Sequence, residues 1–115
     1  VVYLGATDIA MTALKVQEGD QSNMSDATDI AGTDFTSSST LNIEGSAVAL
    51  PTADDDNKFV VINVDLLGRK RYLDLGATAG NGSTGTIAAI FCILSRGKEL
   101  PATNASAGAV QMVNV

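Results

Sequence analysis

The 115-residue chain is long enough for one domain and too short for two. It has no His, one Cys and only 4% aromatic residues, which excludes His-based acid/base catalysis, Ser-His-Asp triads, multi-Cys metal clusters and an internal disulfide. The net charge of −6 argues against nonspecific binding to nucleic acid or to an anionic membrane, and no apolar run approaches the roughly 20 residues of a spanning helix. Since the chain begins at Val1 without Met, we expect that a residue or segment preceding it was removed or not included.

Charge is distributed unevenly along the chain. Residues 1–65 carry eleven acidic and two basic side chains, a net charge of −9, whereas residues 66–115 carry two acidic and five basic ones, a net charge of +3. Arg69, Lys70 and Arg71 form the only basic cluster. A molecule with charge of two signs can meet a neighbouring copy or a large partner through complementary patches. These three residues are therefore candidate partner contacts, although solvated faces that merely differ in sign explain the pattern as well.

The first half of the chain predicts short strands between loops rich in Ser, Thr, Asp and Gly. The segment 11–17 alternates, with Leu14 and Val16 on one face, as in a strand with one buried face. The apolar segment 1–4 is expected to act as an arm or to pair with the C-terminal tail. Weaker strand candidates are 26–31, 40–43 and 46–50.

The middle of the chain predicts a β-hairpin over residues 59–78. In 58–66 the apolar side chains alternate, and 71–78 repeats the pattern after a turn at 67–70 whose Gly68 can adopt a positive φ. We expect this hairpin to be the stability core, with one face formed by Val60, Ile62, Val64, Leu66, Leu73, Leu75 and Ala77.

The segment 86–95 is apolar on both sides and is either a strand covered on both faces or a helix. Its β-branched residues and the flanking glycines favour the strand, with Cys92 as a small core residue. The preceding Gly80–Gly85 stretch fits G-x-G-x-x-G, but a dinucleotide-binding unit needs a helix after it and more chain than follows. A flexible hairpin loop is the better interpretation.

The acidic residues suggest no defined chemistry. Asp54, Asp55, Asp56 and Asn57 could supply oxygen ligands to Ca²⁺, but the Gly and the distal Glu of an EF-hand loop are missing, so a solvated turn is favoured. Four further carboxylates are scattered through loops, and the sequence cannot show whether two of them form a hydrolytic pair: Asp20, Asp26, Asp29 and Asp34. We expect no catalytic residues, no metal and no cofactor.

Six to eight short strands and no convincing amphipathic helix predict an all-β fold, a single small β-sandwich or jelly-roll-like domain with extended terminal arms. The domain is expected over 1–100 and an extended C-terminal arm over 101–115. The arm ends in apolar side chains that could add to a strand edge of a partner, at Val110, Met112, Val113 and Val115. An edge strand within the same chain and a disordered tail are the alternatives.

Several segments, in order and spacing, are similar to those of one protein family. They are VQEGD (16–20), TDIAGTDF (28–35), DNK (56–58), VDLLGRKRYL (64–73), ATAG (77–80) and AAIFCILS (88–95). Over about residues 14–98 the chain resembles the capsid cement, or decoration, proteins of tailed bacteriophages. It departs from that family at Asp74, where a basic or neutral residue is commoner.

The resemblance implies a jelly-roll-like domain that sits on the capsid exterior and clamps neighbouring major capsid proteins. It implies a non-enzymatic virion protein, made in the host cytoplasm, whose partners are the major capsid protein and copies of itself in a dimer or trimer, without nucleic acid or membrane. The alternatives are a ligand- or carbohydrate-binding β-sandwich module, such as one from a phage tail or head fibre, and a small hydrolase using carboxylates. The few aromatic residues count against sugar binding.

Overall fold

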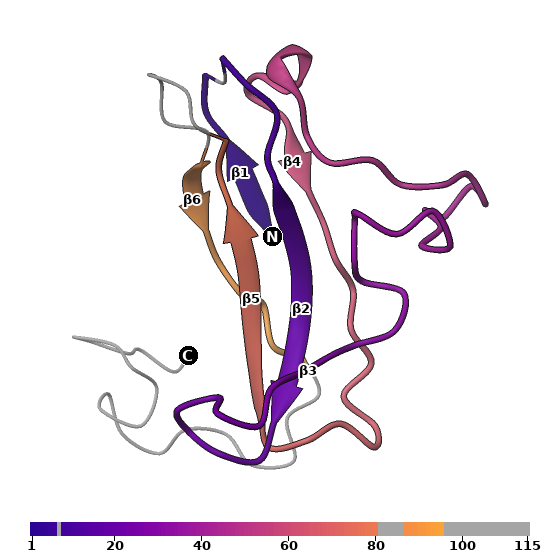
Figure 1. Cartoon of the computed structure of the whole chain (residues 1–115), viewed down its shortest axis with the longest axis vertical. Coiled ribbons are helices and arrows are strands. Elements are labelled where there is room, and N and C mark those ends of the chain that lie inside the picture. Colours follow the sequence, from indigo (N-terminus) through magenta and orange to yellow (C-terminus); the bar gives the residue numbers. More distant parts are fainter. Residues whose placement is uncertain (7, 81–86, 96–115) are drawn as a thin grey trace, which may run out of the picture.

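The computed structural model describes residues 1–6, 8–80 and 87–95 of the chain, and these residues form an all-β structure (Figure 1). One antiparallel sheet has the order β4-β1-β6, from Phe59–Val60, Val2–Leu4 and Ile87–Ile90. The other has the order β3-β2-β5, from Thr28–Asp29, Ala13–Gly19 and Tyr72–Thr78. A short 3-10 helix, η1, spans Ala53–Asp55, so the expected all-β class is confirmed.

The core lies where the two sheets meet. Val2 and Leu4 from β1 pack with Met11 and with Leu14 from β2, and all four side chains are at most 2% exposed. Half-buried side chains from the rest of the chain surround this cluster: Phe35, Leu50, Val60, Ile62, Leu75, Ala77 and Ile87. Because the chain is poor in aromatic residues, small aliphatic side chains carry the burial that stabilises the fold.

Strands β2 and β5 form the longest ladder, with seven residue pairs from Ala13↔Thr78 to Gly19↔Tyr72. Leu14 and Val16 are both buried on one face of β2, as the alternation predicts. The intervening Lys15 and Gln17 lie on the other face, where both bond to Asp29 of β3. The strand expected at 11–17 is therefore confirmed with its faces, and it begins two residues later.

The expected hairpin over 59–78 is wrong in its pairing. The turn exists, with Gly68 at φ +76° and a hydrogen bond from Arg69 N to Leu66 O. However, β4 pairs with β1, in the other sheet, while β5 pairs with β2. A turn sets only the local reversal of the chain, and long-range burial against β1 and β2 decides which strand each arm joins.

Burial in these two arms also differs from the expected core. Along 59–65 the residues alternate as predicted, but Val60, Ile62 and Val64 are half-buried, and only residues 59–60 form a strand. Leu66 and Leu73 are 49% and 41% exposed, which contradicts their core assignment. Neither residue belongs to the core cluster or to the half-buried side chains packed against it, so the period-two pattern continues there without burial.

The strand prediction for 86–95 holds over Ile87–Ile90, but the expected cover on both faces is absent from the described structure. Large side chains from Ile90 to Leu94 are exposed, and so is Cys92, which is therefore not a core residue. The segment 1–4 is not an arm, since β1 is the middle strand of its sheet and pairs with both β4 and β6. Its two inward side chains, Val2 and Leu4, fix it there.

The weaker strand candidates become turns. Of 26–31 only Thr28–Asp29 is a strand, and 40–43 and 46–50 meet in one bridge, Leu41↔Ala47. The Asn42 side chain accepts hydrogen bonds from Glu44 N and Ser46 N, both 3.0 Å long, and holds this loop closed. Within the described residues, no helix has the length and apolar character needed to cross a bilayer.

Candidate functional site

The larger of two hollows in the described part of the chain is a groove of about 570 Å³ beside β4. One wall is β4 and the residues that follow it, up to Asn63, and the other wall comes from the loop 32–48. The lining includes Phe35, Leu41 and Ile43, so most of it is apolar. A groove with mainly apolar walls, a few polar groups and this volume can hold a peptide segment or a small molecule.

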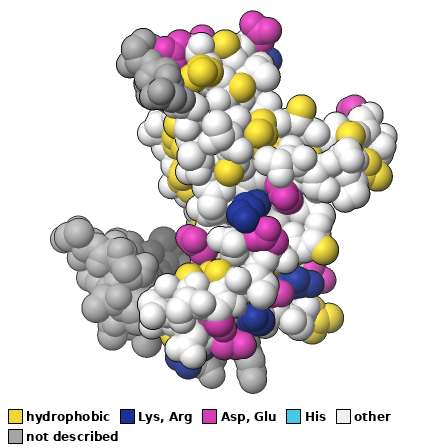
Figure 2. Space-filling model, in the orientation of Figure 1, with side chains coloured by type: hydrophobic (Ala, Val, Ile, Leu, Met, Phe, Trp, Pro, Cys, Tyr) yellow, Lys and Arg dark blue, Asp and Glu magenta, His cyan; other side chains and the backbone are white. Residues whose placement is uncertain are grey.

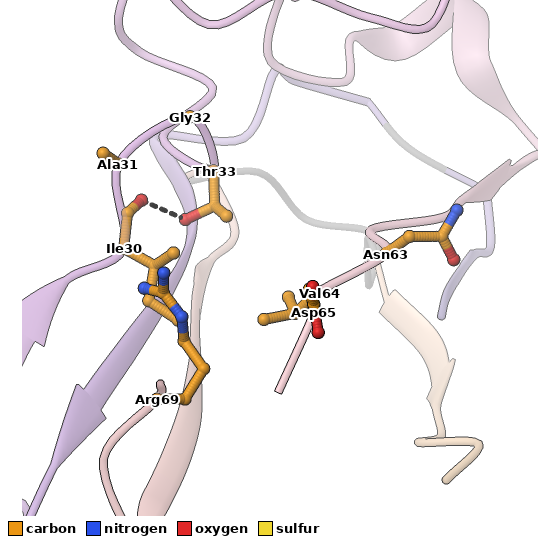
Figure 3. A pocket seen from close by; sticks show the side chains of 8 residues that line it. All are labelled: Ile30, Ala31, Gly32, Thr33, Asn63, Val64, Asp65 and Arg69. Carbon is orange, nitrogen blue, oxygen red and sulfur yellow. Dashed lines mark hydrogen bonds between the residues drawn. The ribbon is translucent and has the colours of Figure 1, made fainter. Parts of the chain in front are cut away.

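A second, smaller hollow of about 200 Å³ continues the groove toward the turn at 66–69. The two hollows share Gly32, Thr33 and Asn63, so they form one depression between the extended segment 59–65 and the loop. Figure 3 shows Asn63, Val64 and Asp65 on one side of this end, facing Ile30–Thr33, with Arg69 below. This end of the depression has a mixed polar and apolar lining and carries both signs of charge, from Asp65 and Arg69.

Thr33 holds the loop wall against β2. Its side chain is buried, and Val16 N donates to its Oγ1 at 3.1 Å. Oγ1 in turn lies 2.8 Å from Ile30 O, the bond drawn in Figure 3, and 3.1 Å from Val16 O. The hydroxyl therefore continues the strand pairing of β2 beyond the two residues of β3, and it fixes where the loop leaves the sheet.

The basic cluster expected to contact a partner is partly engaged within the chain. Arg69 Nη1 lies 3.3 Å from Glu18 Oε1, and the backbone N–H of Lys70 donates to Glu18 Oε2 at 3.0 Å. The guanidinium of Arg71 lies 5.4 Å from the centre of the Tyr72 ring. Since β2 and β5 pair up to Gly19↔Tyr72, the ladder itself brings the turn to Glu18. Arg69 thus serves the fold, while the side chains of Lys70 and Arg71 remain the candidates for a partner contact.

The other candidate partner residues, Val110, Met112, Val113 and Val115, lie outside the described residues, as do Asn81–Gly85 of the glycine-rich stretch. The strand β6 replaces the helix that a dinucleotide-binding unit would need at 86–95. Among the described residues, no group of three acidic or Cys side chains is arranged to hold a metal ion. Residues 54–57 form a capped turn, in which Thr52 Oγ1 accepts from Asp54 N and the Asp55 carboxylate accepts from Thr52 N.

The scattered carboxylates are used locally. Hydrogen bonds from Asp20 N and Gln21 N lower the pKa of Asp26, and the Lys15 and Gln17 side chains lower the pKa of Asp29. The pKa of Asp34 is lowered by its bonds from Thr36, and that of Asp55 by bonds from Thr52 N and Lys58. A general acid in glycoside hydrolysis needs a raised pKa, so these four groups are suited to turns and strand pairing rather than to proton donation.

The groove and the buried Thr33 were not predicted from the sequence. The sequence did contain part of the signal for the groove, since the alternation along 59–65 that turns Val60 and Ile62 inward leaves Phe59 and Val61 on the opposite face. Comparison with protein-family models, with curated proteins and with solved structures finds no match for this chain.

Proposed function

We propose that this chain is a non-enzymatic virion protein, a cement or decoration protein that binds the exterior of a phage capsid and clamps neighbouring major capsid proteins. The proposal includes a jelly-roll-like sandwich with an extended C-terminal arm at 101–115, contacts between copies, and a place on the capsid surface. It rests on the segment resemblance over about residues 14–98 and on one structural observation, the exposed apolar surface of the strand edges.

That surface is large for so small a chain. Among the described residues, twelve large hydrophobic side chains are at least 41% exposed, and those at or next to the edge strands include Phe59 at 60%, Ile90 at 50% and Ile93 at 75%. Exposed apolar patches of this kind mark surfaces that meet another macromolecule. In Figure 2 hydrophobic side chains gather over the half of the molecule that holds β1 and β4, whereas most basic side chains lie in the other half. A lattice of many copies can be held by contacts that are individually weak.

The copy number per particle tests the proposal directly. Phage particles that carry this protein are purified. Quantitative mass spectrometry then measures the molar ratio of this protein to the major capsid protein. A cement protein is expected in hundreds of copies and should rebind to stripped capsids in a sedimentation assay. A few copies, or none, with no rebinding would contradict the proposal.

The basic turn can be tested in the same rebinding assay. Changing Lys70 and Arg71 to Ser should weaken capsid binding, and added salt should narrow the difference from the wild type, because exposed ion pairs are screened. Lys58→Ser is the matched control, since that lysine already pairs with Asp55 at 3.0 Å. Equal, salt-independent binding by all three proteins would remove the turn from the contact.

The carbohydrate-binding alternative has one observation in its favour. The ring of Phe59 is stacked on that of Tyr3, with centroids 4.8 Å apart, and Phe59 is 60% exposed beside the groove. Sugars bind proteins by stacking on such exposed rings. A glycan array read with the wild type and with Phe59→Ala tests this function. A glycan bound by the first protein and lost by the second would favour it over the capsid role.

A further inference from the structure

Two exposed apolar surfaces lie at opposite edges of the sheet β4-β1-β6. At the β4 edge, the groove is lined by Leu41, Phe59 and Val61, which are 58%, 60% and 57% exposed. At the β6 edge, the strand and the residues after it present Ile90, Phe91, Ile93 and Leu94, which are 50%, 45%, 75% and 74% exposed. The first surface is a groove, and the second is a single extended segment.

One chain cannot join its own two surfaces, because β1 lies between them. Val2 pairs with Val60 on one side and with Ile90 on the other, and Phe91 N donates to Val1 O at 3.0 Å. Within the described residues, β4 and β6 pair with no further strand on their outer sides. Open apolar edges of this kind take an added strand from another chain.

We propose that the segment 90–94 of one copy docks in the groove beside β4 of the next copy. The contact is head-to-tail, so it joins two different surfaces and either closes into a ring or continues as a chain of copies. The inference rests on the self-contacts included in the proposed function, and it names the surfaces that make them.

Charge favours the same pairing. Residues 54–58, just before β4, carry three carboxylates and one lysine, a net charge of −2, with Lys58 paired to Asp55 at 3.0 Å. In the sequence, Arg96 and Lys98 lie two and four positions after Leu94. A copy that docks this segment in the groove therefore carries two basic residues close behind it, which offsets part of the repulsion between chains of charge −6.

Three aspartate variants of the full chain test the contact by sedimentation velocity. Val61→Asp alters the groove, Ile93→Asp alters the docking segment, and Leu67→Asp is the matched control, since Leu67 is 86% exposed and lines neither surface. At about 0.1 mM the wild type and the control should sediment as oligomers. The Val61→Asp and Ile93→Asp variants should associate at least about tenfold more weakly, because the contact between copies would bury the introduced carboxylate. Circular dichroism checks that all four proteins fold.

Mixing the two weakened variants identifies the geometry. The Ile93→Asp protein keeps an intact groove, and the Val61→Asp protein keeps an intact segment 90–94. A head-to-tail contact therefore predicts a 1:1 heterodimer of the two variants. Native mass spectrometry detects it when one variant is isotopically labelled. A symmetric contact would show no such rescue. A monomeric wild type, equal behaviour of all three variants, or no heterodimer would overturn the inference.

A cross-link gives a second readout that does not depend on affinity. Cys92 is the only cysteine and lies within the segment, so Phe59→Cys, Val61→Cys or Asn63→Cys provides a partner thiol on the groove side. At least one of these should form a disulfide with Cys92 of another copy and lose it in the Cys92→Ser background. Deleting residues 102–115 tests whether the C-terminal segment, and not the segment 90–94, occupies the groove. Association between copies should persist after the deletion. Its loss would assign the groove to the C-terminal residues instead. Association of the wild-type protein without any rebinding to stripped capsids would leave this contact standing and refute only the capsid role.

Discussion

At the scale of single residues, buried polar groups decide how the loop wall of the groove is held. Thr33 is 6% exposed, and its hydroxyl both accepts from Val16 N and lies within bonding distance of two carbonyls. A hydroxyl in this position satisfies a backbone donor that would otherwise be buried without a partner.

Thr33→Val should therefore destabilise the protein by about 1–3 kcal/mol, since the replacement keeps the shape and leaves Val16 N–H unpaired. Urea denaturation measures the change. The control is Thr12→Val, whose exposed hydroxyl lies 3.5 Å from Thr78 O. It should stay within about 0.5 kcal/mol of the wild type. Equal losses in both variants would mean that the Thr33 hydroxyl does not hold the loop.

Asp26 belongs to the same scale and predicts a response to acid. Its carboxylate accepts from Asp20 N at 2.8 Å and from Gln21 N at 3.1 Å, which lowers its pKa in the folded protein. The Asp side chain in an unfolded chain has a pKa of about 3.9, so the folded protein binds fewer protons than the unfolded protein near that pH. This contribution to stability is present above about pH 4 and is lost as the pH falls through the lowered folded pKa.

The thermal unfolding midpoint should accordingly fall between pH 6 and pH 3, with Asp29, Asp34 and Asp55 contributing in the same direction. Asp26→Asn should show a smaller drop over this range than the wild type. Asp74→Asn, at an exposed position of β5, serves as the control and should keep the full drop. A midpoint that rises on acidification would contradict the assignment.

At the scale of the elements, the interior side of β2 carries more of the stability than the predicted hairpin does. Leu14 is 0% exposed at the centre of the core, whereas Ile62 is only half-buried. Leu14→Ala should cost about 2–5 kcal/mol, because it removes buried methyl groups and leaves a cavity. Ile62→Ala should cost less than Leu14→Ala, and Leu67→Ala at the exposed turn should change stability by less than about 0.5 kcal/mol.

These three truncations are compared by denaturant titration under one set of conditions. The order Leu14, Ile62, Leu67 is the result expected from burial. A larger loss of stability for Ile62→Ala than for Leu14→Ala would mean that the stability core lies in the 59–78 region, as the alternation alone had predicted.

At the scale of the whole molecule, the proposed arm at 101–115 should act between chains and not within one. The described core already buries β1 and β2 against each other without it. Deleting 102–115 should leave the urea midpoint of the free protein nearly unchanged and reduce its retention on capsids. If the deletion unfolds the free protein, these residues belong to the domain and the arm proposal fails.

The sequence by itself determined the features that depend on neighbouring residues. Alternation identified β2 with Leu14 and Val16 inward, and β-branched residues between glycines predicted a strand within 86–95, which forms over Ile87–Ile90. Gly68 marked a turn with positive φ, and the acidic run at 54–56 gave a capped turn. Local backbone preference and side-chain period depend only on residues close together in the sequence, so they can be predicted without knowledge of the fold.

Only the tertiary structure decided which strands meet and what covers them. β1 became a central strand because Val2 and Leu4 fit between β4, β6 and β2, although the segment alone resembles a loose end. Cys92 and its neighbours stayed exposed, because no described layer lies over them. The groove exists only because the loop 32–48 stands opposite 59–63. Partner choice and burial depend on contacts between residues far apart in the chain, which periodicity cannot encode.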